Sequence, residues 1–248
     1  MTISKHYPKK HITEPYIHRS RVLQQDNCFL TILGSDSYRL IFLIINVFHN
    51  HMSMHQILKT VDANIETSTY INKGSFGEVY KVTRRQKDLP VAAIKCVNVC
   101  DLDYYDAQGV LNEVQLLKWL QPFRHPNIIH LHNVNVCGNV LFMGMDYSPI
   151  TLSEAIRTNW LNGYHVRFLT RSILQVVNFL HQCEIIHCDI KPQNILLNIR
   201  DPKQLLNEDM KLNDDCLKLI DFGLSTTTSC VTKRDYVITR WYRPPELL

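Results

Sequence analysis

Several side chains with useful chemistry lie close together in the stretch IHCDIKPQNILLN, residues 186–198. Asp189 could act as a base for a hydroxyl group, because a carboxylate can accept a proton when it is positioned beside one. Lys191 could neutralise a phosphate next to that carboxylate. Asn194 offers a carbonyl oxygen, which is a hard ligand of the kind that Mg²⁺ prefers. These residue types and their spacing indicate chemistry on a phosphate and a hydroxyl group.

Two segments nearer the N-terminus could complete such a site. Gly74 and Gly77 lie in NKGSFGEV, where glycines would let backbone N–H groups approach a phosphate, although an ordinary hairpin turn uses glycines as well. Lys95 ends the apolar run VAAIK, and a buried ammonium is costly unless it is paired. Glu113, in the first convincing helical pattern after that run, offers the partner.

A further carboxylate follows another apolar run. Asp221 begins DFG directly after LKLI, and together with Asn194 it could hold a metal ion near phosphates. Each of these features taken alone has an ordinary structural explanation, such as a lysine exposed to solvent or a common turn. Their occurrence in this order along one chain has no such explanation.

The surrounding sequence predicts the elements that position these groups. Residues 70–82 read as a strand, a glycine turn and a second strand, and residues 91–99 and 139–147 read as further strands. Residues 106–120 place Val110, Val114, Leu117 and Leu120 at helical spacing. Residues 166–182 do the same with the apolar set Leu169, Ile173, Val176, Val177 and Leu180. A small strand-rich lobe followed by a helix-rich lobe is expected.

From Tyr70 to Leu248, the series of glycine loop, strand lysine, helix glutamate, H-x-D-x-K-x-x-N and DFG resembles the eukaryotic-type serine/threonine protein kinases. The resemblance implies an α+β, bilobal kinase-like fold, with a β-rich N-lobe and a helical C-lobe that lacks its C-terminal helices. It implies an extension without a recognised motif over residues 1–60 and a kinase domain over 61–248. The N-lobe would cover about 65–147 and the partial C-lobe about 148–248.

The resemblance also assigns roles to residues, with ATP and Mg²⁺ as cofactors. It implies that Asp189, Lys191, Lys95 and Glu113 are catalytic and that Asn194 and Asp221 bind the metal. Leu117, Leu131, Phe222 and His187 would stack between the lobes. Fourteen ATP-binding positions follow from it: Ile71, Asn72, Gly74, Ser75, Phe76, Gly77, Val79, Ala93, Lys95, Met145, Asp146, Tyr147, Ser148 and Leu196.

The C-terminal stretch YVITRWYRPPELL narrows the resemblance to the group that contains cyclin-dependent and mitogen-activated kinases (CMGC). Tyr236, Thr239 and Arg243 stand where that group has its loop tyrosine, its threonine and its arginine. This implies a preference for Ser or Thr followed by Pro. The alternative is that the segment is retained from an ancestral kinase although the substrate preference of this chain has changed.

The sequence departs from the family pattern at three positions of the site. Asn72 stands where the first glycine of the loop is expected, and Asn tolerates a positive φ better than most residues. Cys188 replaces the arginine that usually clamps a phosphorylated loop residue, and Arg234 occupies the usual phosphothreonine position. We therefore expect activity without a loop phosphothreonine, and Tyr236 is the residue of this loop that could be modified. Essential phosphorylation at Thr232 or Tyr236 would count against this expectation.

Two departures concern length. The segment from Asn194 to Asp221 is longer than in typical relatives, and its extra polar residues, 198–215, are expected to form a solvated hairpin loop, with a docking site as the alternative. The chain also stops soon after Glu246, where typical relatives continue with helices. A large apolar face would then be exposed, and a regulatory protein could cover it. The alternatives are that the chain is a fragment or does not become an active enzyme.

The composition excludes little but agrees with this interpretation. A net charge of +4 does not demand nucleic acid as a partner. The eight cysteines contain no CxxC pair, which favours an intracellular protein, cytoplasmic or nuclear. RLIFLIINVF, residues 39–48, is shorter than the roughly 20 residues of a membrane span. The expected function is ATP-dependent phosphorylation of Ser or Thr in protein substrates, and the alternative is a catalytically weak or inactive kinase-like binding module.

Overall fold

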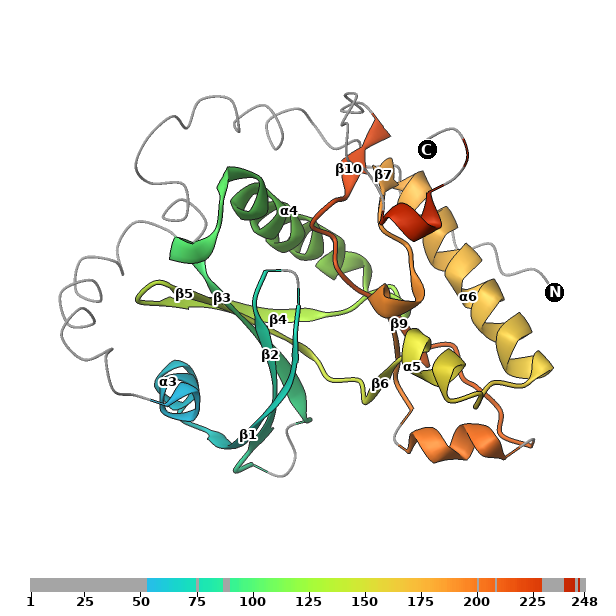
Figure 1. The fold of residues 1–248 in the computed structure, drawn as a ribbon, viewed down its shortest axis with the longest axis horizontal. Helices are drawn as coiled ribbons and strands as arrows, with labels where there is room; N and C mark the ends of the chain where they lie inside the picture. Colours follow the sequence, from blue (N-terminus) through green and yellow to red (C-terminus); the bar gives the residue numbers. More distant parts are fainter. Residues whose placement is uncertain are drawn as a thin grey trace.

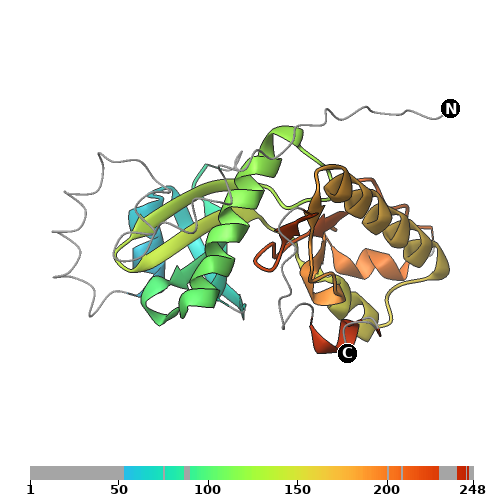
Figure 2. The same ribbon diagram turned by 90° about the horizontal axis from the view of Figure 1, so that it is seen from above.

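The computed structural model shows a strand-rich part and a helix-rich part side by side (Figure 1). Figure 2 shows the same two parts from above. This arrangement confirms the predicted α+β, two-lobed fold. No helix among the described residues is long and apolar enough to cross a membrane. The structure describes residues 53–74, 76–86, 90–199, 201–207, 209–228, 239–243 and 245.

The N-terminal lobe is built on one antiparallel sheet with the strand order β1-β2-β3-β5-β4. Strand β3 lies in the middle, so its apolar run is buried from Ala92 to Val97. Successive side chains of a strand point to opposite faces, so Ile94 and Cys96 join one apolar cluster and Val97 joins the other. The strands are β1 (Ile65–Lys73), β2 (Glu78–Arg84), β3 (Ala92–Asn98), β4 (Leu131–Cys137) and β5 (Val140–Asp146).

One helix covers each face of this sheet. Helix α4 (Tyr104–Leu120) begins at Asp103, whose side chain accepts a hydrogen bond from Asp106 N, and the predicted apolar face of the helix is buried. Figures 1 and 2 both place α4 against the sheet on the side toward the helical lobe. This position brings the polar residues of α4 close to the junction of the lobes.

Helix α3 (Met54–Val61) covers the opposite face, and the sequence analysis did not anticipate it. Ser53 and Gln56 form a reciprocal capping box at its start. Ile57 and Leu58 are buried in the cluster that contains Phe142. The predicted domain boundary after residue 60 therefore falls at the last turn of a helix that packs on the sheet. The apolar stretch 39–48 lies outside the described residues.

The C-terminal lobe begins after β5, where the chain passes into β6 (Ile150–Thr151) and α5 (Leu152–Arg157). Helix α6 (Gly163–Gln182) buries Leu169, Val176 and Leu180, as its spacing predicted. Short strands then carry the loops of interest: β8 pairs with β6 and β9, and β7 pairs with β10. Their bounds are β7 (Ile185–Ile186), β8 (Ile195–Leu197), β9 (Leu217–Leu219) and β10 (Thr226–Thr227).

The long segment between β8 and β9 differs from its predicted form. A short 3₁₀ helix spans Pro202–Leu206, and Leu205 is only 2% exposed. Leu212 is buried as well, and both residues belong to the same apolar cluster as α6. The expectation of a solvated hairpin loop is therefore wrong at these two positions. The segment is polar on average, and an average composition does not reveal that two single apolar residues in it are buried.

Candidate functional site

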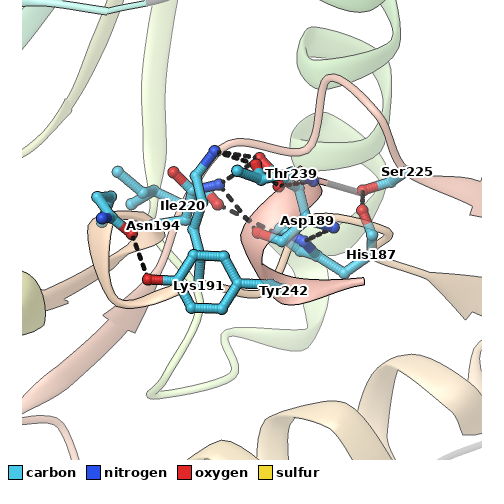
Figure 3. A network of polar contacts seen from close by, with 9 residues as sticks. His187, Asp189, Lys191, Asn194, Ile220, Ser225, Thr239 and Tyr242 are labelled. Carbon is cyan, nitrogen blue, oxygen red and sulfur yellow. Dashed lines mark hydrogen bonds and ion pairs between the residues drawn. The ribbon is translucent and has the colours of Figure 1, made fainter. Parts of the chain in front are cut away.

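The loop between β7 and β8 gathers its polar side chains around one carboxylate (Figure 3). Asp189 is 4% exposed. Lys191 Nζ donates to Asp189 Oδ2 at 2.7 Å, and Asn194 Nδ2 donates to the same oxygen at 2.8 Å. Asn194 Nδ2 also donates to the Asp189 backbone carbonyl at 2.9 Å. The three residues singled out in the sequence thus form one hydrogen-bonded group.

A distant threonine completes the group. Thr239 Oγ1 donates to Asp189 Oδ1 at 2.7 Å, and Lys191 Nζ donates to that hydroxyl at 2.9 Å. The resemblance had placed Thr239 in the family pattern without assigning it a contact, because no local pattern links positions so far apart. Both Asp189 oxygens therefore have donors, and one donor is a hydroxyl group.

These contacts decide the charge of Asp189. Burial alone would raise the pKa of its carboxyl, but the hydrogen bonds from Lys191 and Thr239 lower the pKa below its usual value. The carboxylate is therefore ionised at neutral pH and can accept a hydrogen bond from an alcohol. The Thr239 contact shows that a hydroxyl fits against this carboxylate at hydrogen-bonding distance.

A second charged pair joins strand β3 to helix α4. Lys95 Nζ is 2.7 Å from Glu113 Oε2, and both side chains are buried. Burial alone would lower the pKa of Lys95, but the charges of Glu113 and Asp221 more than offset it and hold that pKa above its usual value. Lys95 therefore stays charged, with carboxylates from α4 and from the DFG segment as its counter-ions.

The DFG segment is held by contacts that the sequence analysis did not identify. Asn112 Nδ2, on α4, approaches the carbonyl oxygens of Phe222, Gly223 and Ser225 at 3.1, 3.2 and 2.7 Å. Asn112 precedes Glu113 and carries no motif of its own, so only the fold reveals its partners. Helix α4 and the DFG segment are thereby tied together.

The predicted stack between the lobes is present in part. Leu117, Leu131 and Phe222 are all buried in one apolar cluster. The His187 and Phe222 rings meet edge to face with centroids 4.8 Å apart. His187 Nε2 lies 3.1 Å from the Ile220 carbonyl oxygen, which connects the two loops.

Asn194 and Asp221 offer oxygen ligands that fit Mg²⁺. The amide nitrogen of Asn194 is engaged by Asp189, so its carbonyl oxygen Oδ1 remains available as a ligand. Ile220 N donates to the Asn194 backbone carbonyl at 3.0 Å, which places the next residue, Asp221, beside the same loop. A carboxylate and an amide oxygen together match the hard ligands of this metal.

The glycine loop is a tight turn between β1 and β2. Gly74 N donates to Gly77 O at 2.7 Å, and Ser75 lies outside the described residues. A side chain at Gly77 would overlap the backbone carbonyl of Cys96 on β3, so close packing requires glycine there in addition to any phosphate. The ring of Phe76, a residue of this turn, has its centroid 5.6 Å from Lys95 Nζ.

One expectation about this loop is corrected. Asn72 is not in the positive-φ region, where its tolerance was thought to matter, but lies within β1 opposite Val79. A register shift between Tyr70 and Asn72 leaves Ile71 out of the pairing. Because Asn72 has ordinary strand geometry, a glycine is not needed there for backbone reasons.

The remaining predicted ATP-binding residues lie on strands of both lobes and on the segment after β5. Ala93 on β3 is opposite Met145, and Val79 on β2 is opposite Lys95. Asp146 ends β5 and is followed by Tyr147 and Ser148, all three half-buried, and Leu196 lies on β8.

Cys188, another of the departures, has a φ of 64°, an uncommon backbone conformation for a residue other than glycine. Asp221 is similar, with a φ of 66°. Thr232, Arg234, Tyr236 and Glu246 lie outside the described residues, so the hypothesis about loop phosphorylation stays a prediction.

Comparison with known proteins agrees with this geometry. Residues 65–248 match the family described as "Protein kinase domain". The chain is 33% identical over 211 residues to extracellular signal-regulated kinase 7 of Drosophila melanogaster, a match covering 79% of this chain and 21% of that protein. Mitogen-activated protein kinase 3 of Oryza sativa subsp. japonica is 32% identical over 206 residues, or 80% and 51% of the two chains. Extracellular signal-regulated kinase 2 of Dictyostelium discoideum is 30% identical over 208 residues, or 79% and 52%. The chain thus spans about half or less of the length of these relatives.

Proposed function

From the premise that this chain belongs to the protein kinase family, we propose that it transfers the γ-phosphate of ATP to Ser or Thr hydroxyls of protein substrates. The observation that carries the proposal is the Asp189 group. A buried, ionised carboxylate there accepts a hydrogen bond from a hydroxyl at 2.7 Å, with a lysine ammonium beside both.

ATP with Mg²⁺ would supply the transferable phosphoryl group and the positive charge that phosphate oxygens require. In this proposal, Asn194 Oδ1 and the Asp221 carboxylate hold the metal, and the Gly74–Gly77 turn lies over the phosphates. Lys95, fixed by Glu113, contacts phosphate oxygens. The adenine base of ATP is held by the apolar side chains of Val79, Ala93 and Leu196 and by the segment from Met145 to Ser148.

Asp189 orients the substrate hydroxyl and receives its proton, while Lys191 stabilises the negative charge of the transferring group. A lowered pKa makes Asp189 a weak base, which suits a reaction in which positioning and charge neutralisation supply most of the catalysis. The chain's own residues thus provide an acceptor, a cation and an amide oxygen in one hydrogen-bonded group, with the Asp221 carboxylate on the neighbouring segment.

A preference for Ser or Thr followed by Pro belongs to this proposal. It is supported by the resemblance of YVITRWYRPPELL to the CMGC pattern and by the names of the relatives, which are mitogen-activated and extracellular signal-regulated kinases. A cytoplasmic or nuclear location and a regulatory protein on the C-lobe are further parts of it. Comparing a Ser-Pro peptide with its Ser-Ala counterpart would test the preference.

The second candidate function is a catalytically weak kinase-like module that binds a partner. Cys188 favours it, because the family usually has at this position the arginine that clamps a phosphorylated loop residue. The connected Lys95–Glu113 pair and Asp189 group favour catalysis, since binding alone does not require them.

Transfer of labelled phosphate from ATP to a Ser/Thr peptide mixture tests the proposal. Asp189→Asn should lower the rate by about 10²–10⁴-fold, the usual contribution of a positioned base. Asp209→Asn, which alters an exposed carboxylate, is the matched control and should leave the rate unchanged. No transfer by the folded, ATP-binding chain would favour the binding module instead.

A further inference from the structure

A second cluster of ligand-type side chains lies at the adjacent ends of the paired strands β4 and β5. Among the residues that the structure describes, His130, His132 and Asp146 bring one ligand atom each within 4.8 Å of one another. His130 immediately precedes β4, His132 lies on β4, and Asp146 ends β5. The proposed catalytic roles do not use these side chains.

The spacing of the two imidazoles suits a shared metal ion. His130 Nδ1 and His132 Nδ1 are 3.2 Å apart. Two nitrogens bound tetrahedrally to Zn²⁺, each at ~2.0–2.1 Å, would be separated by about 3.3 Å. The two nitrogens already lie at nearly the separation that one shared ion requires.

Asp146 occupies the position of an orienting partner. Its Oδ1 is 2.8 Å from His132 Nε2, on the ring nitrogen that faces away from His130. A ligating histidine commonly donates its other N–H to a carboxylate, which fixes the tautomer and leaves the first nitrogen as a lone-pair donor. The order carboxylate, His132, His130 therefore resembles a metal site with its outer hydrogen bond in place.

The backbone around the cluster is fixed, while its surface is open. Asp146 N donates to the His130 carbonyl at 3.3 Å, so the ends of the two segments are joined. The side chains of His132 and Asp146 are 36% and 32% exposed, which would let an ion and its remaining water ligands enter.

We propose that His130 and His132 bind a transition-metal ion of the Zn²⁺ class through their Nδ1 atoms, with Asp146 orienting His132. This inference goes beyond the proposed kinase function and does not depend on it. Since Asp146 is also a predicted ATP-binding residue, an ion held by its neighbours would stiffen the end of β5. Without metal, the same contact is an N–H···N hydrogen bond between the rings.

The test is metal binding to the full chain, measured without reference to activity. The chain has 12 histidines and 8 cysteines, so the site must be identified by difference between variants. Zn²⁺ uptake is measured by equilibrium dialysis, and Co²⁺ absorption distinguishes nitrogen from thiolate ligands. His132→Gln should lose one bound ion of the nitrogen type, and Asp146→Asn should weaken that ion by about 10–100-fold.

His181→Ala is the matched control, because it removes an exposed histidine far along α6 and should leave binding unchanged. His130→Ala should lose the same ion as His132→Gln. If His130→Ala fails to fold, the exposed His132 still gives an answer on a folded chain. Equal Zn²⁺ uptake and affinity in the parent chain and in His132→Gln would overturn the proposal.

Discussion

Asn112 gives the sharpest test of how the two lobes are coupled. Its amide donates to three backbone carbonyls of the DFG segment, and Asn112→Asp keeps the shape of the side chain while removing both N–H donors. At neutral pH the new carboxylate would face those carbonyl oxygens. The substitution therefore replaces attraction with repulsion at a half-buried contact without creating a cavity.

The size of the effect follows from the geometry. An amide has two hydrogens, so the 2.7 Å contact to Ser225 uses one, and Phe222 and Gly223 share the other. A net hydrogen bond contributes about 0.5–1.5 kcal/mol, so the two together stabilise by about 1–3 kcal/mol. Local opening of the DFG segment should therefore become about 5–150-fold more frequent.

Hydrogen exchange reads that opening directly. The Ser225 amide donates to the Phe222 carbonyl at 3.1 Å, so its exchange rate reports whether this turn is closed. Gln115→Glu is the matched control, since it makes the same amide-to-acid change at an exposed position one turn away on α4. Urea denaturation of both variants gives the global free energy of unfolding alongside.

The expected result is faster Ser225 exchange in Asn112→Asp and unchanged exchange in Gln115→Glu. If the two variants agree in exchange rate and lie within about 0.5 kcal/mol in unfolding free energy, the coupling of α4 to the DFG segment through Asn112 is refuted. Faster Ser225 exchange with an unchanged free energy of unfolding would show that Asn112 affects only local opening of the DFG segment.

Three further predictions concern stability. Glu113→Gln leaves its buried lysine partner without its nearest counter-ion and should cost about 3–5 kcal/mol in urea denaturation; a loss below about 1 kcal/mol would contradict this. Gly77→Ala should lower the melting temperature, with a cost of about 1–3 kcal/mol, because its methyl would overlap the Cys96 carbonyl; Gly74→Ala, with more room, is the control, and equal melting temperatures would argue against the packing role. Burial and a neighbouring lysine lower the pKa of His125 to about 4, so the unfolded chain binds more protons between about pH 6.5 and 4. Unfolding free energy should fall as pH falls through that range, and the slope should be smaller in His125→Asn; an identical slope in both proteins would count against it.

Much of the architecture follows from local pattern. The apolar spacing of residues 106–120 predicted α4 and its buried face, and the order of motifs indicated that Lys95, Glu113, Asp189 and Asn194 would come together. Glycines between two strand-like runs predicted the turn at Gly74. These features depend on periodicity or on motifs, both of which are written in short stretches of chain.

The features that were missed depend on contacts between distant segments. Asn112 finds its acceptors on the DFG segment, and Thr239 reaches Asp189 from the far end of the chain. The need for glycine at position 77 comes from the neighbouring strand rather than from the turn itself. Leu205 and Leu212 are single apolar residues in a polar segment, which no periodic pattern could reveal.

Helix α3 affects the choice of the first residue for an expressed fragment of this protein. The family match begins at residue 65, but Ile57 and Leu58 are 8% and 0% exposed where they cover the sheet. Burying an aliphatic side chain of this size contributes about 1.5–3 kcal/mol, and a domain has only about 5–15 kcal/mol in total. An expression fragment that starts at residue 65 would expose the apolar face of the sheet that α3 covers, which would favour aggregation. A fragment that starts at Ser53 retains the capped helix.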